Sequence, residues 1–225
     1  MAIAPSFDLY SFWRTSATYR VRVACRLKGI TPREHNVNLD TGEQRSPEFL
    51  KINPMGAIPA LIERTNGASA TPITQSMAIL EFLEESQPSP ALLPTDLHGR
   101  ARVRSLAALL TSDTHPLITP RVKKYLMAQA GFDDAAWRAW QTNWFTTGLQ
   151  ALEQRLATEP ETGIYCHGDH ITMADICLAS IVVVMRVFKI DVADIPTVMR
   201  IMATCEAHPA FANSAPSLQM GAPAS

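Results

Sequence analysis

The pattern of apolar and polar positions divides the chain near residue 86. Before that point, stretches that alternate every second residue are interleaved with stretches of helical periodicity, and after it the periodicity is helical throughout. The pattern predicts strands around residues 7–11, 37–39, 58–62 and 73, and helices over residues 16–28, 47–52 and 76–83, with a turn at Asn66-Gly67. The order β-α-β-α-β-β-α is typical of a small mixed sheet covered by helices.

The second part of the chain predicts helices alone. Apolar side chains recur every three or four residues from Trp137 to Leu156, which indicates one long amphipathic helix. Thr172 and Asp175 have the spacing of a capping box, and they predict a buried helix over residues 176–188. The tail from Asn213 onward is rich in Ala, Pro and Ser, and we expect it to have little to pack against. We expect an α/β domain over residues 1–85, a linker over 86–94 and an all-helical domain over 95–225.

Composition narrows the class of protein. The 225 residues carry 20 Lys and Arg against 21 Asp and Glu, and 47% of them are hydrophobic, which excludes a disordered chain. No apolar run approaches the roughly 20 residues of a membrane span, and no basic leader precedes the first strand, so we expect a cytoplasmic protein without a membrane partner. Four scattered cysteines predict reduced thiols and no metal site: Cys25, Cys166, Cys177 and Cys205.

One segment departs from the balanced charge. Residues 14–28 contain Arg14, Arg20, Arg22, Arg26 and Lys28 but no acid. Because Arg binds carboxylates through a rigid fork of donors, the segment indicates an anionic small molecule, and it is too short to indicate nucleic acid. Of these five cations, we expect only Arg14 to contact such a molecule. The other four cations are expected on the helix surface, with Arg20 and Arg22 in structural or dimer-edge ion pairs.

Short motifs along the chain carry a resemblance to a known family. They are Leu9-Tyr10-Ser11, Arg20-Val21-Arg22-Val23-Ala24, Val37-Asn38-Leu39, Asn53-Pro54-Met55, Ile58-Pro59, Gln75-Ser76-Met77-Ala78-Ile79, His115-Pro116-Leu117, Arg121-Val122, Tyr165-Cys166-His167-Gly168-Asp169, Thr172-Met173-Ala174-Asp175 and Phe188-Lys189-Ile190-Asp191. Together, over residues 5–210, they resemble the cytosolic glutathione transferases and, among these, the zeta class, which includes maleylacetoacetate and maleylpyruvate isomerases. The resemblance implies a thioredoxin-like α/β domain followed by an all-α domain, glutathione as cofactor, and a homodimer.

The resemblance assigns two loops to glutathione. Pro59 stands where a central strand would need an N–H donor, and the family has a cis peptide before it, so that the main chain of Ile58 pairs with the cysteinyl residue of glutathione. Gln75 and Ser76 stand where a loop enters a helix, a natural carboxylate site that the family fills with the γ-glutamyl group. Gln44 aligns with a family Gln that reaches the tripeptide. An edge strand at Pro59 and a plain helix cap at Ser76 are the alternatives.

The same resemblance places the activation of the thiol at the start of the first helix. Zeta enzymes carry Ser-Ser-Cys after an Arg there, and this chain carries Thr15-Ser16-Ala17 after Arg14. A hydroxyl donor and a helix N-terminus both favour thiolate over thiol. Thr15 and Ser16 are therefore the candidate catalytic residues, with Thr15 slightly ahead. The alternative is that either one only caps the helix.

The substrates of the zeta isomerases are dicarboxylates, which cations must receive. Arg14 is the leading candidate for this role, and it counts among the catalytic candidates. His115, Thr119 and Arg121 occupy a stretch that the resemblance assigns to glutathione, with His115 and Arg121 also facing substrate. The family has a substrate-binding Arg directly before a Phe, whereas Arg186 stands one residue earlier, which rotates its side chain by about 100° on a helix.

The resemblance implies glutathione-dependent cis-trans isomerisation of a maleyl dicarboxylate to its fumaryl product, together with glutathione transferase activity. Conjugation of glutathione to small electrophiles, or their dehalogenation, is the alternative, and the shifted Arg186 and Thr119 in place of a family Asn favour it. A non-catalytic glutathione-binding protein of the same fold is a third hypothesis. The motifs Ile58-Pro59 and Gln75-Ser76 argue against this third hypothesis.

Overall fold

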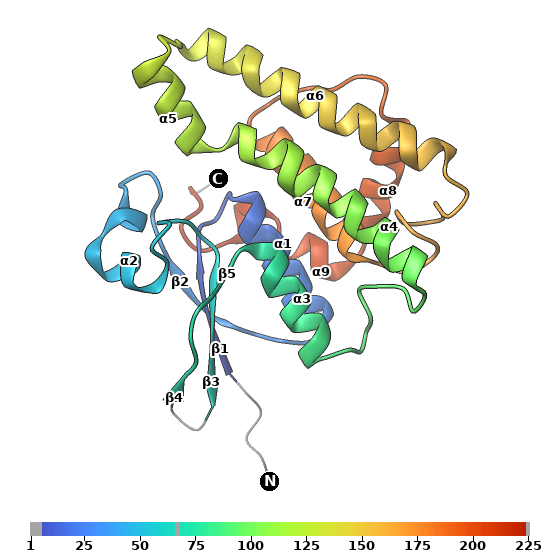
Figure 1. Ribbon diagram of the computed structural model, residues 1–225, viewed down its shortest axis with the longest axis horizontal. Helices are drawn as coiled ribbons and strands as arrows, with labels where there is room; N and C mark the ends of the chain where they lie inside the picture. The colour runs from blue at the N-terminus through green and yellow to red at the C-terminus, as the bar shows by residue number, and fades with distance from the viewer. Residues whose placement is uncertain (1–5, 66–67, 224–225) are drawn as a thin grey trace. The chain divides into compact units, whose positions relative to one another are not determined.

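The computed structural model describes residues 6–65 and 68–223, which divide into two compact units (Figure 1). The first unit contains the described residues up to 91 together with residues 209–223, and the second contains residues 92–208. The turn predicted at Asn66-Gly67 lies outside the described residues. The α/β pattern of the sequence therefore belongs to the first unit, and most of the helical pattern belongs to the second.

A mixed sheet with helices forms the first unit. Its elements are β1 (Ser6–Ser11), α1 (Ser16–Leu27), β2 (Arg33–Asn36), η1 (Glu43–Arg45), α2 (Pro47–Ile52), β3 (Ala60–Thr65), β4 (Ala68–Ser69), β5 (Ile73–Thr74), α3 (Ser76–Ser86), α9 (Pro209–Ala212) and η4 (Pro216–Leu218). β1 pairs in parallel with β2 and antiparallel with β3, and β3 pairs antiparallel with β4 and β5. α1 packs against α3. This is the thioredoxin-like arrangement that the resemblance implies.

The second strand lies earlier than the sequence pattern predicts, over Arg33–Asn36 and not over residues 37–39. The strand is polar, so it shows no alternation of apolar residues that would predict it. Its side chains bind charged groups instead of packing in the core. Arg33 Nε and His35 Nε2 lie 2.6 and 2.9 Å from Oδ1 of Asp8, which is buried on β1. Burial alone would raise the pKa of Asp8, but the hydrogen bonds from its basic neighbours hold it well below its usual value.

Helices make up the second unit. They are α4 (Leu97–Ala108), η2 (Leu109–Thr114), η3 (His115–Ile118), α5 (Pro120–Gln129), α6 (Asp134–Thr158), α7 (Met173–Val187) and α8 (Pro196–Ala207). α6 carries the apolar face predicted between Trp137 and Leu156. The predicted capping box is confirmed at the start of α7, where the N–H of Thr172 lies 2.8 Å from Oδ2 of Asp175. None of the helices described is both long and apolar enough to cross a membrane.

α4 continues into a π-helical turn, η2, and then into a 3-10 turn, η3, which the sequence pattern does not predict. The buried side chain of Thr114, the last residue of η2, packs against Gly148 of α6, where an added Cβ would lie 2.1 Å from Thr114 Oγ1. Trp140 Nε1, also on α6, donates a hydrogen bond of 2.7 Å to the carbonyl oxygen of Leu117. α6 therefore holds in place the turn that begins with His115.

Replacing Gly148 by alanine is expected to destabilise the protein. The new methyl group would overlap the buried Thr114 side chain, and overpacking of this kind costs about 1–3 kcal/mol, of which better helix propensity returns up to about 1 kcal/mol. Thermal unfolding followed by circular dichroism measures the loss. The exposed neighbour Thr147→Ala serves as the control and should change little, and adding Thr114→Ala to Gly148→Ala should recover part of the loss. A Gly148→Ala protein as stable as wild type would contradict the packing described.

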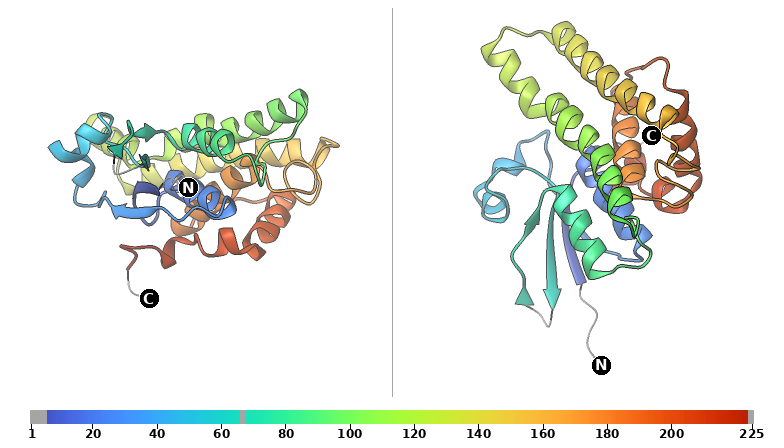
Figure 2. Two further views of the ribbon diagram at one scale, coloured as in Figure 1. Left: turned by 90° about the horizontal axis from the view of Figure 1, so that it is seen from below. Right: turned by 45° about the vertical axis from the view of Figure 1, so that its right-hand side comes forward.

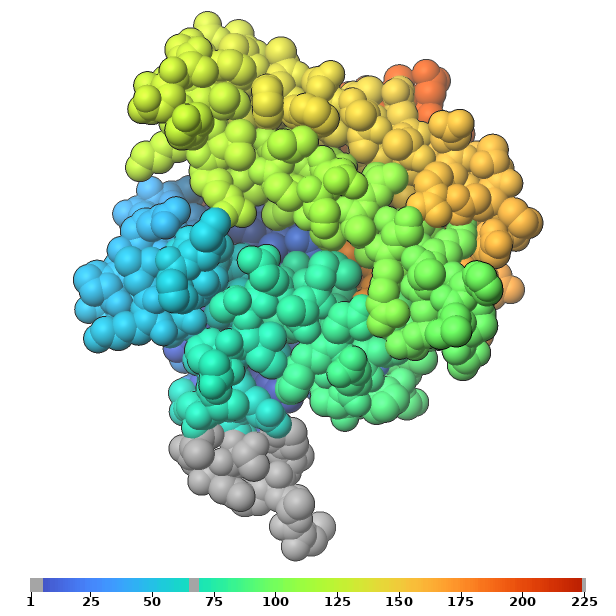
Figure 3. Space-filling view, viewed as in Figure 1, coloured from blue at the N-terminus to red at the C-terminus, as the bar shows by residue number. Residues whose placement is uncertain are grey.

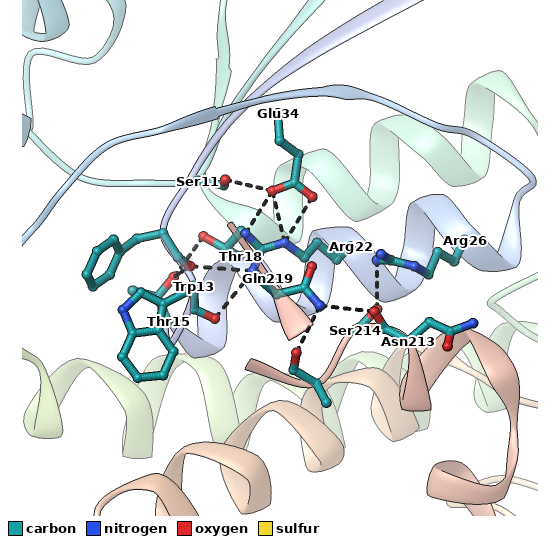
Figure 4. A network of polar contacts seen from close by, with 12 residues as sticks. Ser11, Trp13, Thr15, Thr18, Arg22, Arg26, Glu34, Asn213, Ser214 and Gln219 are labelled. Carbon is teal, nitrogen blue, oxygen red and sulfur yellow. Dashed lines mark hydrogen bonds and ion pairs between the residues drawn. The ribbon is translucent and has the colours of Figure 1, made fainter. Parts of the chain in front are cut away.

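The C-terminal tail is packed onto the first unit, contrary to the expectation from its composition. α9 packs against α1, and the two lie side by side in the views of Figures 1 and 2. Ser214 is buried and its Oγ accepts a hydrogen bond of 3.0 Å from Arg26 Nη1 of α1. Nε2 of Gln219 donates to the carbonyl oxygens of Asn213 and Ala215 (Figure 4). The expectation was wrong because small residues allow the main chain to approach a helix closely, although each one buries little area.

Candidate active site

The turn between α2 and β3 carries the first group of candidate residues. The Ile58–Pro59 peptide is cis, as the resemblance implies. Asn53 shapes the turn, because its side chain accepts from the N–H of Met55 at 3.1 Å and donates to the carbonyl of Ala57 at 2.5 Å. β3 starts directly after Pro59, and the main chain of Ile58 makes no hydrogen bond to any residue in the described ranges. The N–H and C=O of Ile58 are therefore available to an extended ligand.

Gln44 lies in η1, beside this turn. A Cβ added at Gly56 would lie 2.8 Å from the carbonyl oxygen of Gln44, and φ at Gly56 is +58°, so the two segments meet at a position that requires glycine. Oε1 of Gln44 is buried, and no donor among the described residues reaches it. Because buried polar atoms are nearly always hydrogen-bonded, this oxygen is available to a donor from outside the described chain. η1 and α2 form the light-blue surface in Figure 3.

α3 begins next to the cis-proline turn. Ala60 of β3 pairs with Thr74 of β5, so Pro59 and Gln75 are neighbours at the ends of two paired strands. Gln75 has φ +70° and ψ +117°, a conformation that residues other than glycine rarely adopt and that is found mainly at functional sites. Ser76, the first residue of α3, is buried. Its hydroxyl and the first N–H groups of α3 form the donor set predicted for a carboxylate.

The two hydroxyl candidates for thiol activation lie at the start of α1. Thr15 is the N-cap residue, and its hydroxyl is 2.7 Å from Oγ1 of Thr18 and 3.4 Å from the carbonyl oxygen of Phe12 (Figure 4). Ser16 is buried, and its Oγ accepts a hydrogen bond of 3.3 Å from Nη1 of Arg20. The helix N-terminus favours an anion at this position. The hydroxyl of Thr15 therefore bonds within the turn, whereas that of Ser16 faces a cation.

Three of the four other cations of segment 14–28 are buried, so their expected place on the helix surface is wrong. Arg20, Arg22 and Lys28 are only 2%, 1% and 2% exposed. The structural ion pair expected for Arg22 is present, with its Nη2 2.7 Å from Glu34, and Lys28 pairs with Glu84 at 2.6 Å. The periodicity of α1 was misleading because this helix is covered by both α3 and α9, which leaves it little free surface.

Arg14, the leading candidate for substrate binding, lies in the loop between β1 and α1. Its guanidinium carbon is 5.4 Å from the centre of the Phe12 ring and equally far from that of Trp13. It forms an ion pair with Asp40, whose side chain is 54% exposed. Exposed pairs of this kind contribute little free energy, so an anionic substrate can compete with Asp40 for the guanidinium.

The second unit carries three candidates within seven residues, from the start of η3 to the first turn of α5. His115 begins η3, and Thr119 is the N-cap residue of α5, where its hydroxyl donates to the carbonyl of Pro116 at 3.0 Å. Arg121 lies in the first turn of α5 and is exposed. The π-helical turn before His115 is a further feature that sequence reasoning missed, and π-helical turns are frequent at functional sites.

Arg186 forms an ion pair on the surface of the second unit. It is exposed on α7, and its Nη1 lies 2.5 Å from Oε1 of Glu206 on α8. Arg138 of α6 donates to the carbonyl oxygens of Phe188 and Lys189, which fixes the end of α7. Arg186, which stands one residue before the position of the family's substrate-binding Arg, therefore forms an ion pair on the surface of the helical unit.

The four cysteines do not supply a nucleophile. All of them are buried, and burial raises the pKa of Cys25 to about 12 and raises those of Cys166 and Cys205 as well. Thiols of this kind are inert near neutral pH. Throughout the described ranges, no three or more His, Cys, Asp or Glu side chains are grouped so as to hold a metal ion.

Family models match both units. The model of the glutathione S-transferase N-terminal domain matches residues 5–85, and that of the glutathione S-transferase C-terminal domain matches residues 134–213.

Relatives cover nearly the whole chain. Maleylpyruvate isomerase from a Ralstonia species is 39% identical over 94% of this chain and 97% of its own. The crystal structure of maleylacetoacetate isomerase from Methylobacterium extorquens AM1 with bound malonate and GSH is 45% identical, with a TM-score of 0.91 over 96% of this chain and 100% of its own. That of the Anaeromyxobacter dehalogenans 2CP-1 enzyme, with bound dicarboxyethyl glutathione and citrate, is 36% identical, with a TM-score of 0.85 over 98% and 95%.

Proposed function

The chain belongs to the glutathione S-transferase family, in its zeta class of maleylacetoacetate and maleylpyruvate isomerases, and from this membership we propose that it isomerises a maleyl dicarboxylate with glutathione as cofactor. The observation on this chain that carries the proposal is the set of polar groups without protein partners in the first unit. The main chain of Ile58 and Oε1 of Gln44 lie at the turn between α2 and β3 and in the segment beside it, and neither is hydrogen-bonded within the described chain.

These groups fit the chemistry of glutathione. The N–H and C=O of Ile58 suit the cysteinyl main chain, which would add to them as a short extended strand. Oε1 of Gln44 suits an N–H donor of the tripeptide. Gln75, Ser76 and the N-terminus of α3 suit the γ-glutamyl carboxylate.

The residues at the start of α1 act on the thiol. When bound, glutathione supplies a thiolate that adds to the cis double bond and leaves after rotation about the resulting single bond, which gives the trans product and free glutathione. Thr15 or Ser16 donates a hydrogen bond to the sulfur, and the N-terminus of α1 favours the negative charge there. Arg14 binds a substrate carboxylate and orients the substrate for the reaction. This mechanism requires no covalent bond to a side chain of the protein.

The second unit supplies further candidates for glutathione and substrate. His115, Thr119 and Arg121 retain the roles that the resemblance implies, since they follow one another closely along η3 and the start of α5. Arg186 is omitted from the proposed substrate site, because it stands one residue before the family position and its side chain is rotated by about 100°.

A spectrophotometric assay of maleylacetoacetate and maleylpyruvate, with and without glutathione, tests the proposal. We expect isomerisation of at least one of the two acids, and only when glutathione is present. Retention on immobilised glutathione is the companion measurement. Binding to glutathione with no turnover of either acid would overturn the isomerase proposal. Failure to bind glutathione would overturn every proposal in which glutathione is the cofactor.

One observation favours a second candidate function. Because Arg186 stands one residue before the family position, a shift that rotates its side chain by about 100° on a helix, the site loses a cation that the family uses for dicarboxylates, and a substrate with fewer carboxylates fits better. Conjugation of glutathione to a small electrophile, or its dehalogenation, is therefore the second candidate. Turnover of small halogenated acids in the absence of isomerase activity would select it.

A further inference from the structure

Arg20 connects the two helix starts that we assign to glutathione. Its side chain is only 2% exposed. Nε donates a hydrogen bond of 3.0 Å to Oγ of Ser76, the first residue of α3, and Nη1 donates one of 3.3 Å to Oγ of Ser16, the first residue of α1. The proposed mechanism uses both serines and leaves the buried cation behind them without a role.

The chemistry of a guanidinium fixes the direction of these hydrogen bonds. Arginine has five N–H donors and no acceptor, so each serine oxygen must accept from Arg20 and must turn its own proton elsewhere. Neither Ser16 nor Ser76 donates that proton to another residue in the described part of the chain. A hydroxyl that accepts from a cation is also a stronger donor, because consecutive hydrogen bonds polarise one another. Both serines are therefore oriented to donate to an acceptor outside the described part of the chain.

We infer that Arg20 is a positioning residue for glutathione, which orients Ser76 to donate to the γ-glutamyl carboxylate and Ser16 to donate to the thiolate. The inference rests on the proposed function and deepens it. One guanidinium then prepares the donors for both negative groups before the ligand arrives, so little reorganisation is needed on binding. A purely structural Arg20, which only ties α1 to α3, would have no effect on the thiol.

The test compares Arg20→Met with wild type, using glutathione and S-methylglutathione as ligands. Calorimetric titration gives the affinities, and the ultraviolet absorbance of the thiolate against pH gives the pKa of bound glutathione. We expect roughly tenfold weaker binding of both ligands through Ser76, and a rise of about one unit in the pKa of the bound thiol through Ser16. S-methylglutathione has no ionisable thiol, so it reports the carboxylate end alone.

Double variants assign each effect to its serine. In a Ser16→Ala background, Arg20→Met should no longer change the pKa of the bound thiol. In a Ser76→Ala background, Arg20→Met should no longer weaken the binding of S-methylglutathione, because two residues that act through one interaction have non-additive effects. Lys28→Met is the matched control: it removes another buried cation at the end of α1 and should lower thermal stability while leaving the thiol pKa unchanged.

Arg20→Lys covers the case in which Arg20→Met fails to fold. Lysine keeps the charge but lacks the fork that reaches two hydroxyls at once, so we expect a thiol pKa between those of wild type and the methionine variant. A folded Arg20 variant with wild-type affinities and a wild-type thiol pKa would overturn the inference and leave the proposed function intact. Failure of the wild-type chain to bind glutathione would overturn both.

Discussion

Replacing Arg22 by methionine is expected to lower the unfolding free energy by about 3 kcal/mol, the lower end of the range for breaking a buried ion pair. Arg22 is 1% exposed and donates to Glu34 through Nε at 3.0 Å and through Nη2 at 2.7 Å. Its Nη1 lies 3.4 Å from the carbonyl oxygens of Phe12 and Trp13 (Figure 4). For a protein of this size the melting temperature should fall by roughly 6–12 °C, which differential scanning calorimetry can measure.

The loss should depend on pH in a defined direction. Burial acts to raise the pKa of Glu34, but Arg22 lowers it below its usual value, so in wild type this carboxylate stabilises the fold above the unfolded pKa of about 4.3 and loses that effect as the pH falls. Without Arg22 the remaining burial raises the pKa of Glu34. The difference in stability between variant and wild type should therefore shrink below about pH 4.

Arg26→Met is the matched control, because Arg26 is an exposed cation of the same helix. Its loss removes one hydrogen bond, to Ser214, and should change the stability by less than about 1 kcal/mol. Equal losses from Arg22→Met and Arg26→Met, or a loss from Arg22→Met that does not change with pH, would contradict the role of the buried pair.

Removing both hydroxyls at the start of α1, in the double variant Thr15→Val with Ser16→Ala, is expected to lower kcat/KM for isomerisation by about 10²–10³-fold. Without these donors the thiol of bound glutathione should ionise at higher pH, so the deficit should narrow as the pH rises towards the free thiol pKa of about 8.5. The pH profile of kcat/KM and the ultraviolet absorbance of bound glutathione give the two readouts.

The single variants decide between the hydroxyls. The hydroxyl of Thr15 already bonds to Thr18 and Phe12, whereas that of Ser16 has its proton directed away from Arg20, so Ser16→Ala should raise the thiol pKa at least as much as Thr15→Val. Ser46→Ala is the control, because Ser46 caps α2 with a hydrogen bond of 3.2 Å. It should cost about 1 kcal/mol of stability and leave the thiol unchanged. Wild-type kcat/KM in the double variant would remove these hydroxyls from the mechanism.

The starts of the helices could be predicted from the sequence, because helix capping depends on residues that are close together in the chain. The capping box of Thr172 and Asp175, the Pro-containing start of α2 and the start of α3 at Ser76 all follow from residue types within a few positions. The cis peptide before Pro59 came from the resemblance and is also present.

Features that depend on distant contacts were inaccessible from the pattern. β2 is polar because Arg33, Glu34 and His35 bind charges on β1 and α1, which a count of apolar residues cannot detect. The sequence does not distinguish Arg20 from an exposed arginine. Its hydrogen bond to Ser76 depends on the packing of α3 against α1 and is seen only in the structure. The π-helical turn before His115 likewise packs, through Thr114, against Gly148, more than thirty residues later on α6.

The packing of the C-terminal segment onto α1 has a consequence for the order in which the protein folds. The first unit is discontinuous in sequence, since α9 and Ser214 follow the entire helical unit. At typical synthesis rates the nascent sheet exists for on the order of ten seconds before these residues emerge. During that time the side of α1 that carries Arg26 is not yet packed against α9 and Ser214. A fragment that ends before residue 209 therefore reproduces a nascent state of the first unit, with that side still exposed.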